Sequence, residues 1–436
     1  MQNETETAVS DRPVRIISLA RNTSAKSKDE PPDRRYYEAM DVTAPRPSIW
    51  VIGSENPRIR DFFNEVGRWM DVTYLDIERI GHKPSIDQLL DSWRWRRRDG
   101  GFPEARICVP LRWPGVSRTL SHWFCRRRFA QAERPDAVVF TWPHLASLCE
   151  WLPDVFRIYY CKDPFDRWPG DSARVRAQEN SLLHHCDAAF AVSRQIVQDM
   201  VPRARAKVFY CPNAVEDSFV NAPPQPRPRD LPVGRPIIGC IGRMNNTYDW
   251  EYVAHLTAAL PDAIFCFVGP LAGCNEFDRR HILSQFRSTA NILWLGDRPH
   301  RQVIAYIQHF DVCFNCLRAN DNNDRRSPLR LFDYLAGDRP VLSTAVREAY
   351  EHLPHVFIAP SPQEGADTIR KLLDGRLGVD TAARHKYIQR NTWSVRAEEF
   401  VGHLQECGFS TRRASDPNLL PPGGKLPDQR QDATAA

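Results

Sequence analysis

Short runs of apolar residues alternate with longer amphipathic stretches through most of the chain. In the first half the apolar runs predict strands over residues 48–52, 72–76, 106–109, 137–141, 157–160, 188–192 and 207–210, with a helix over 193–200 that Ser193 caps. After residue 236 a second series predicts strands over 237–241, 263–268, 292–295, 312–316, 341–343 and 356–359. The stretches between these strands predict helices over 249–260, 276–287, 301–309, 328–336 and 362–374. Strands and helices that alternate in this way are typical of parallel sheets with crossover helices.

A Pro-rich segment separates the two series, with six prolines among residues 223–236. Proline lacks the N–H that helices and central strands need, so this segment is predicted to be a linker. We therefore predict an α/β protein with these parts: a disordered tail 1–45, a first Rossmann-like domain 46–221, the linker 222–236, a second Rossmann-like domain 237–378, C-terminal helices 379–410 and a disordered tail 411–436. Ligands of such folds bind beyond the carboxyl ends of the strands, so the site is expected in a cleft between the domains.

Composition limits the class of protein further. Hydrophobic residues make up 42% of the 436 residues, which is enough for two sizeable cores. The apolar runs are strand-sized, and residues 1–33 lack the apolar core of a signal peptide, which predicts a cytoplasmic protein without a membrane span. The twelve cysteines show no disulfide framework, and reduced thiols are expected. Cys313 and Cys316 lie close together but have no second pair nearby, so no zinc site is predicted.

Positive charge is concentrated in residues 79–134, which hold 13 Lys and Arg against 5 Asp and Glu. Among these cations lie Trp93, Trp95, Trp113, Trp123 and Phe124. Arg and Trp together suit an anionic membrane surface, where each cation adds about 1 kcal/mol. Peripheral contact with the inner face of the cell membrane is therefore one interpretation, and a solvated helix face with buried tryptophans is the other. Since the net charge of the whole chain is only +5, nucleic acid is not expected as a partner.

The segment RSPLRLFDYLAGDRPVL, which begins at Arg326, carries the most informative chemistry. It predicts a loop, a helix with Ser327 as N-cap and Pro328 as first residue, and a short buried strand. A helix N-terminus carries about +0.5 elementary charge and free N–H groups, which suit a phosphate. Arg330 adds a cation and Asp333 offers a carboxylate to a ribose, so a sugar-nucleotide pocket is predicted. The alternative is an ordinary amphipathic helix with two solvent-facing charges.

This segment resembles the nucleotide-binding helix of GT-B glycosyltransferases of the group 1/family 4 type. Further motifs follow in that family's order over roughly residues 48–408: Pro212-Asn213-Ala214-Val215, Gly242-Arg243, Asn291-Ile292-Leu293-Trp294-Leu295-Gly296 and Asn391-Thr392-Trp393. The resemblance implies two Rossmann-like domains that face each other across a cleft, and a C-terminal helix that crosses back to the N-terminal domain. It also implies a nucleotide-sugar donor and no metal or other cofactor.

The resemblance assigns several residues to the donor side. Arg243, after Gly242, looks like the arginine with which relatives contact the diphosphate. The lysine that follows in many relatives is absent, so Arg243 and Arg330 are expected to neutralise the leaving group together. Asp333 resembles the second acid of the family's Glu-x7-Glu motif, but the first acid falls at Arg325. Because the pair is incomplete, an inverting reaction is favoured over a retaining one.

On the acceptor side, Asp163 is the predicted catalytic base, and Asp166 is the second candidate. Asp163 follows a predicted strand, and Pro164 disfavours helix at the residue before it. Here the chain also resembles the inverting glucuronosyltransferase of xanthan synthesis, whose base is an aspartate of the first domain. By the same resemblance, Asp297 and Leu329 join the donor side. A turn that Asp163 merely caps is the alternative.

Two more residues lie near the ends of predicted strands. Gly53 follows the first strand and is predicted to leave room for the acceptor or the sugar. His144 lies near the position of a catalytic histidine of retaining relatives, although the aligned residue is Thr141. A structural role for His144 is the alternative.

Together these features predict a glycosyltransferase of hexosyl or glucuronosyl type. It would transfer a sugar from a UDP- or GDP-sugar to a glycan or lipid-linked saccharide in polysaccharide, including exopolysaccharide, biosynthesis. Two alternatives stay open. One is a sugar-nucleotide epimerase of the same fold, for which no clear set of acids is seen. The other is a nucleotide-sugar-binding protein without turnover, which the absent lysine and first acid would fit.

Overall fold

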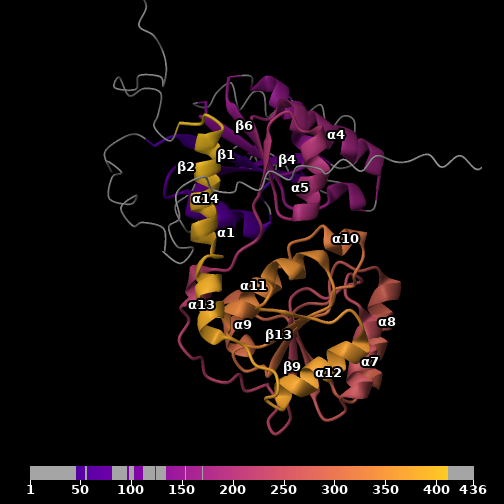
Figure 1. The fold of residues 1–436 in the computed structure, drawn as a ribbon. Coiled ribbons are helices and arrows are strands. Elements are labelled where there is room, and N and C mark those ends of the chain that lie inside the picture. Colours follow the sequence, from indigo (N-terminus) through magenta and orange to yellow (C-terminus); the bar gives the residue numbers. More distant parts are fainter. Residues whose placement is uncertain are drawn as a thin grey trace, which may run out of the picture. The chain divides into compact units, whose positions relative to one another are not determined.

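The computed structural model of the chain, drawn in Figure 1, describes residues 46–54, 56–80, 96–97, 103–110, 123, 134–152, 154–168 and 170–410. The two predicted tails, 1–45 and 411–436, lie outside these residues, as does most of the basic segment 79–134. The predictions of disorder and of membrane contact for these segments therefore stay predictions. Within the described ranges, no helix is both long enough and apolar enough to cross a bilayer.

The described residues of the first half of the chain form an eight-stranded sheet. Its strands are β1 (Ser48–Ile52), β2 (Asp71–Ile80), β3 (Arg96–Arg97), β4 (Pro103–Pro110), β5 (Ala137–Phe140), β6 (Phe156–Cys161), β7 (Ala188–Ala191) and β8 (Lys207–Tyr210). They are ordered β3-β4-β2-β1-β5-β6-β7-β8. Neighbouring strands run parallel except β3, which pairs antiparallel with β4 and was not predicted.

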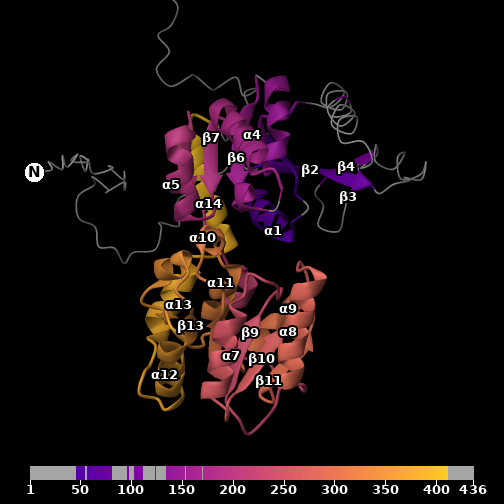
Figure 2. The ribbon, with the colours of Figure 1, turned by 90° about the vertical axis from the view of Figure 1, so that its right-hand side faces the viewer.

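The second half forms a six-stranded parallel sheet, in which β9, β10 and β11 lie side by side (Figure 2). Its strands are β9 (Ile237–Ile241), β10 (Ile264–Val268), β11 (Ile292–Gly296), β12 (Val312–Asn315), β13 (Val341–Ser343) and β14 (Phe357–Ile358). Their order, β11-β10-β9-β12-β13-β14, reverses direction between β9 and β12. In doubly wound sheets, ligands bind at such a reversal, beyond the carboxyl ends of the strands.

Helices connect the strands. Each predicted strand and helix is present, and most of them begin or end a few residues away from the predicted position. The α-helices are α1 (Pro57–Val66), α4 (Ser172–His185), α5 (Arg194–Met200), α6 (Asp217–Val220), α7 (Trp250–Ala259), α8 (Glu276–Ser288), α9 (His300–Ile307), α10 (Asp321–Asp324), α11 (Leu329–Ala336), α12 (Pro362–Leu373), α13 (Thr381–Gln389) and α14 (Trp393–Glu406). Short 3₁₀ helices cover Pro143–Trp151, Phe165–Arg167, Val201–Arg203 and Arg347–His352. As predicted, the Ser193 side chain caps α5 by accepting from the Ile196 N–H.

The C-terminal helices divide between two hydrophobic cores. Ile388 of α13 lies in the core of the second sheet, whereas Trp393 and Phe400 of α14 lie in the core of the first. Phe400 meets Phe62 of α1 edge to face, with ring centres 5.4 Å apart, and α14 lies next to α1 in Figure 1. Burying large rings in this way contributes most of the stability of such a contact. The prediction that the last helix returns to the first domain is therefore confirmed.

Residues 222–236 contain no helix or strand, as their prolines predict, but they are tied to the second sheet's helices. The Asp230 carboxylate accepts hydrogen bonds from Arg298, at 2.7 Å, and from the Tyr306 hydroxyl of α9, at 3.0 Å. The Gln225 N–H donates to the Gln308 side chain at 2.8 Å. This segment thus packs against its neighbours instead of extending freely.

Glu348 joins the two halves of the chain. It lies in the 3₁₀ helix after β13 and is 2% exposed. One carboxylate oxygen accepts from the Arg194 N–H, at the start of α5, at 2.7 Å. The other accepts from the Tyr210 hydroxyl, at the end of β8, at 2.8 Å. The Arg194 guanidinium lies over the Tyr210 ring, 4.4 Å from its centre, and donates to Glu351 at 2.5 Å. A single buried carboxyl thus receives hydrogen bonds from two elements of the first half.

Burial raises the pKa of Glu348 to about 7, although the hydrogen bonds from Arg194 and Tyr210 act in the opposite direction. A carboxyl whose pKa is higher in the folded than in the unfolded chain favours folding while it is protonated. That contribution is complete below the unfolded pKa of about 4.3 and is lost as the pH rises through the folded value.

Replacing this carboxyl by an amide removes the titration and keeps the shape. We therefore expect the free energy of unfolding of Glu348→Gln, relative to the native protein, to increase by about 2–3 kcal/mol between pH 5 and pH 8. Urea denaturation at four pH values measures this difference. The matched control is Glu276→Gln on α8, whose acid is exposed and pairs only with Arg280 in the described part of the chain. A constant difference between Glu348→Gln and the native protein across this pH range would contradict the account.

Candidate active site

Two glycines let the carboxyl ends of β9 and β10 approach each other closely. Gly242, with a φ of +107°, donates its N–H to the Val268 carbonyl at 2.9 Å. A Cβ on Gly269, whose φ is +142°, would lie only 2.1 Å from the Gly242 carbonyl oxygen. Residues with side chains rarely adopt such φ values. The glycines therefore leave the backbone bare at the edge where the strand order of the second sheet reverses.

Arg330, in the first turn of α11, extends its guanidinium over this bare edge. A Cβ on Gly242 would meet its Nη2 at 3.3 Å. The guanidinium carbon lies 4.6 Å from the centre of the Tyr248 ring, and Nη1 donates to the Cys240 sulfur at 3.8 Å. Within the described residues no carboxylate lies within 4.0 Å of it. Arg330 is thus a positioned cation without an acid partner.

The groups that hold Arg330 are themselves fixed by buried contacts. Tyr248 and Tyr334 are fully buried, and their hydroxyls both reach Ile241 at the end of β9. The Ile241 N–H donates to the Tyr334 oxygen at 2.8 Å, and the Tyr248 hydroxyl donates to the Ile241 carbonyl at 3.5 Å. A cation over a tyrosine face gains up to about 2 kcal/mol when it is desolvated. Sequence reasoning missed Tyr248, because nothing in a loop residue shows that its ring will lie under an arginine.

The thiol of Cys240 adds partial negative charge to the surroundings of the Arg330 guanidinium. Burial alone raises the pKa of Cys240, but a hydrogen bond with the Cys316 thiol, at 3.7 Å, and the charge of Arg330 lower it to about 7. Burial also lowers the pKa of Arg330, and its neighbours Tyr248 and Cys240 raise it above the ordinary value, so the guanidinium stays charged. The lowered pKa of Cys240 and the raised pKa of Arg330 have one cause in common, which is the contact of the Arg330 guanidinium with buried groups such as the Cys240 thiol.

The start of α11 differs from the prediction in one respect. Pro328, not Ser327, is the N-cap, so the prediction that Ser327 caps the helix is wrong. The Ser327 hydroxyl instead accepts from the Asn213 N–H at 3.1 Å, and its carbonyl accepts from the Asn213 side chain at 2.7 Å. The first turn therefore has no side-chain cap, and Leu329 packs against the core of the first sheet. Uncapped N–H groups at a helix start attract anions.

Asp333 lies one turn after Arg330 but has different neighbours. It is 5% exposed, and burial raises its pKa to about 6, while the charges of Arg58 and His300 lower it. Those two residues both pair with Glu216, at 3.6 Å and 3.1 Å. The predicted contact of Asp333 with a ribose stays a prediction.

Arg243 and Asp297, the other predicted donor residues, are both exposed. Arg243 directly follows Gly242 and makes no hydrogen bond or ion pair with any described residue through its side chain. Asp297 follows the edge strand β11, two strands away from β9. The structure thus places Arg243 next to Gly242 at the end of β9, whereas Asp297 follows the strand at the edge of the sheet.

Asp163 lies two residues after β6, at the carboxyl edge of the first sheet. Its carbonyl accepts from the Phe165 N–H at 2.9 Å, which fixes the loop. Its carboxylate, by contrast, makes no hydrogen bond or ion pair with the residues described. Burial raises the pKa of Asp163, and the charges of Arg326 and Lys162 partly offset this. A half-buried carboxylate with a raised pKa has the properties of a general base.

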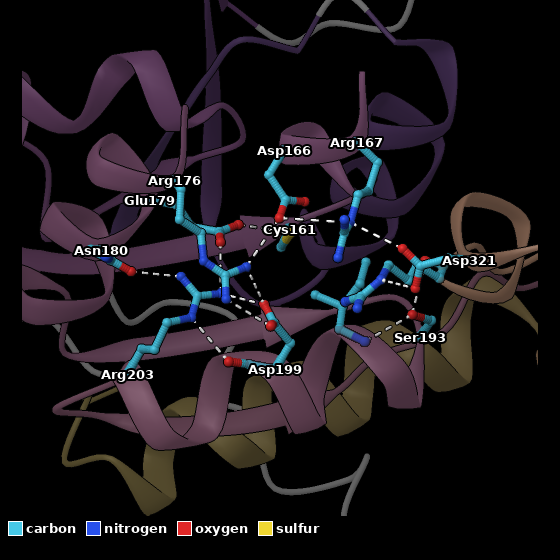
Figure 3. A network of polar contacts seen from close by, with 12 residues as sticks. Cys161, Asp166, Arg167, Arg176, Glu179, Asn180, Ser193, Asp199, Arg203 and Asp321 are labelled. Carbon is cyan, nitrogen blue, oxygen red and sulfur yellow. Dashed lines mark hydrogen bonds and ion pairs between the residues drawn. The ribbon is translucent and has the colours of Figure 1, made fainter. Parts of the chain in front are cut away.

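Asp166 is engaged elsewhere, as Figure 3 shows. Its carboxylate accepts from Arg176 at 3.0 Å and lies 3.9 Å from Arg167. Arg176 also binds Asp199, which in turn pairs with Arg203. Asp166 is therefore one acid of an ion-pair network on the first sheet's helices, whereas Asp163 keeps its carboxylate unpaired.

The two remaining acceptor-side residues surround Trp142. Gly53 has a φ of +86°, and a Cβ there would lie 2.5 Å from the Trp142 ring and 2.7 Å from the Thr141 hydroxyl oxygen. The space that Gly53 leaves is thus filled by protein side chains. His144 is exposed, with its ring centre 5.6 Å from that of Trp142. The predicted roles of both residues toward a substrate stay predictions.

Two further features bear on ligand binding. A hollow of about 770 Å³ lies along α7 and at the start of α12, lined among others by Asp249, Tyr252 and Gln363, and none of the predicted site residues line it. In the ranges described, no three His, Cys, Asp or Glu side chains gather as a metal site would require. The expectation of a metal-independent reaction is not tested by this.

Comparisons with known proteins agree with this geometry. Residues 250–402 match the family described as "Glycosyl transferase-like". A Bacillus subtilis (strain 168) protein named "Putative teichuronic acid biosynthesis glycosyltransferase TuaH" is 25% identical over 175 residues, which are 39% of this chain and 43% of that protein. The chain thus matches less than half the length of this curated relative. The local resemblance to the xanthan glucuronosyltransferase stays a prediction.

Solved structures show the same fold at low sequence identity. A trehalose-phosphate synthase from Burkholderia vietnamiensis has a TM-score of 0.62 and 16% identity, over 85% of this chain and 100% of that one. Anabaena HepE in complex with UDP has a TM-score of 0.60 and 12% identity, over 83% and 100%. Sucrose-phosphate synthase from Thermosynechococcus elongatus has a TM-score of 0.61 and 13% identity, over 83% and 99%. The chain therefore has the GT-B fold of these glycosyltransferases, and its residues 250–402 match a glycosyl transferase-like family.

Proposed function

We propose that the protein is a GT-B glycosyltransferase of polysaccharide biosynthesis. It transfers a sugar from a UDP- or GDP-sugar to a glycan or lipid-linked saccharide. The observation that carries the proposal is Arg330: a cation without an acid partner, held at the reversal point of the second sheet beside an uncapped helix start. The UDP complex of HepE, a protein of the same fold, supports a nucleotide diphosphate as the ligand.

On the donor side, Arg330, the N–H groups at the start of α11 and the exposed Arg243 would surround the diphosphate. Negative charge develops on the leaving group when the glycosidic bond to phosphate breaks, and fixed cations and helix ends stabilise such charge. The bare backbone at Gly242 lets the phosphates come close. In this arrangement the protein's own positive charges stabilise the leaving diphosphate, and no metal is required.

On the acceptor side, Asp163 would serve as the base. Its carboxylate takes the proton of the acceptor hydroxyl, whose oxygen attacks the anomeric carbon as the diphosphate leaves with the bonding electrons. This is a single displacement and inverts the anomeric configuration. The raised pKa of Asp163 fits a base, because a proton acceptor works best when its pKa lies nearer the working pH. The sugar transferred would be a hexosyl or a glucuronosyl group.

Release of free nucleotide tests the proposal. The full chain is incubated with a panel of UDP- and GDP-sugars, with and without glycan acceptors, and UDP, GDP and new glycans are measured. Transfer to an acceptor supports the proposal. Tight nucleotide binding without turnover would instead support a binding protein, and conversion of the donor sugar without release would support an epimerase.

Removal of the guanidinium should weaken nucleotide binding. A charge-assisted hydrogen bond contributes about 1.5–3 kcal/mol, so we expect Arg330→Ala to raise the Kd for UDP or GDP roughly 10- to 150-fold in calorimetry. The control is Arg280→Ala, whose guanidinium is 79% exposed on α8. Unchanged affinity in Arg330→Ala would remove this residue from the donor site.

Asp163→Asn should separate binding from chemistry. Because the amide cannot accept the proton, we expect a loss of about 10²- to 10⁴-fold in kcat with the nucleotide Kd unchanged. Nucleotide release with saturating donor and acceptor gives kcat, and calorimetry gives the Kd. Asp374→Asn, at an exposed turn, is the control. Native turnover in Asp163→Asn would show that another group is the base.

A further inference from the structure

Arg326 is a half-buried arginine whose charge no described residue neutralises. It lies between α10 and α11, and its N–H donates to the Asn323 carbonyl at 3.1 Å. Its side-chain Nε is shielded from solvent and makes no hydrogen bond. No carboxylate of a described residue lies within 4.0 Å of its guanidinium. An N–H group that is withdrawn from water without a partner costs free energy, and a hydrogen bond to a ligand would recover it.

The neighbouring arginines differ from Arg326 in this respect. Arg325 donates to Asp321 at 3.0 Å. Arg167 of the first half pairs with the same carboxylate at 3.1 Å, as Figure 3 shows. Asp321 is thus shared by two cations, and it is not available to a third. Arg325 and Arg167 thus each have an acid partner, whereas Arg326 has none among the described residues.

The charge of Arg326 acts on Asp163, the proposed base. Among the charges that lower the pKa of Asp163, that of Arg326 is the largest, followed by that of Lys162. Lys162 lies over the Trp142 ring, with Nζ 4.3 Å from its centre. Neither cation is within ion-pair distance of the Asp163 carboxylate. Both charges thus act on the proposed base, and the loop that carries Arg326 meets the segment after Asp163 through the pair of Arg167 with Asp321.

We propose that Arg326 binds the carboxylate of a uronic acid, carried either by the sugar that is transferred or by the acceptor sugar. This rests on the proposed function, because it places the sugars by reference to Asp163. A guanidinium can grip a planar carboxylate through two parallel hydrogen bonds, which gives orientation as well as charge. Arg330 has a separate role, since it lies at Gly242 and Tyr248 on the second sheet.

The test compares substrates that differ only in the carboxylate. In the donor arm, nucleotide release by the full chain is measured with UDP-glucose against UDP-glucuronate and with GDP-mannose against GDP-mannuronate. In the acceptor arm, acceptors end in glucose or in glucuronate. The native protein should favour the carboxylate-bearing member at least tenfold in kcat/KM in one arm, and that arm identifies the sugar concerned.

The variants assign this preference to Arg326. Arg326→Gln should abolish it, with a larger fall in kcat/KM for the carboxylate-bearing substrate than for the neutral one, whereas Arg326→Lys should retain part of it. The control is Arg376→Gln, whose guanidinium is 69% exposed. Circular dichroism verifies folding, and Arg326→Lys is the informative variant if Arg326→Gln does not fold. Equal use of charged and neutral substrates by the native protein in both arms would overturn the inference. An equal loss on both substrates in Arg326→Gln would also overturn it, since it would show an effect through Asp163 alone.

Failure of the proposed function has a different signature. If no donor releases nucleotide, binding of methyl glucuronide and methyl glucoside to the native protein is compared by NMR titration with UDP present. Tighter binding of the glucuronide that Arg326→Gln loses would support the carboxylate site on its own. Equal binding of the two glycosides, or tighter binding of inorganic phosphate than of glucuronide, would overturn it.

Discussion

The contact between the Arg330 guanidinium and the Tyr248 ring is the interaction on which the rest of the account depends. An arginine at a protein surface usually gains little from any one partner, because water competes for it. Here the Tyr248 ring and the Cys240 sulfur hold the cation, and no carboxylate of a described residue lies within 4.0 Å of it. Positive charge is therefore available at the carboxyl edge of the second sheet for a ligand that brings negative charge.

The fold maintains this arrangement from several directions. Gly242 and Gly269 let two strand ends meet so closely that the backbone lies open to a ligand. Tyr334, one turn further along the same helix as Arg330, binds the end of β9 and fixes α11 against the sheet. Glu348 and Ser327, on either side of α11 in the sequence, each accept a hydrogen bond from the first half of the chain, from Arg194 and from Asn213. The segments around this helix are therefore connected to both sheets.

Much of the fold could be predicted from the sequence. Strands such as β9 and β13 are continuous runs of buried apolar residues, so periodicity and turn residues locate them to within a few residues. The prolines of 222–236 indicate the irregular segment, and Trp393 with its flanking residues indicates the last helix. The two-residue strand β3 carries no such signal, because its pairing with β4 depends on the tertiary structure.

The site was predictable only in part. Arg330 and Asp163 could be identified from the sequence, since a cation near a helix start and an acid after a strand both lie near the carboxyl ends of the strands, where such folds bind ligands. Ser327 was misassigned because a serine before proline is a common cap, and the sequence cannot show that Asn213, more than a hundred residues earlier, takes up its hydroxyl. Tyr248 and Arg326 gave no signal, since their importance lies in what is near them in space.

The central claim is that Arg330 contacts the diphosphate of a bound nucleotide, and a structure of the protein with UDP or GDP tests it most directly. We expect a phosphate oxygen within about 3 Å of the Arg330 guanidinium, with the diphosphate at the start of α11. A nucleotide bound away from Gly242 and Arg330, or none bound at millimolar concentration, would contradict the account.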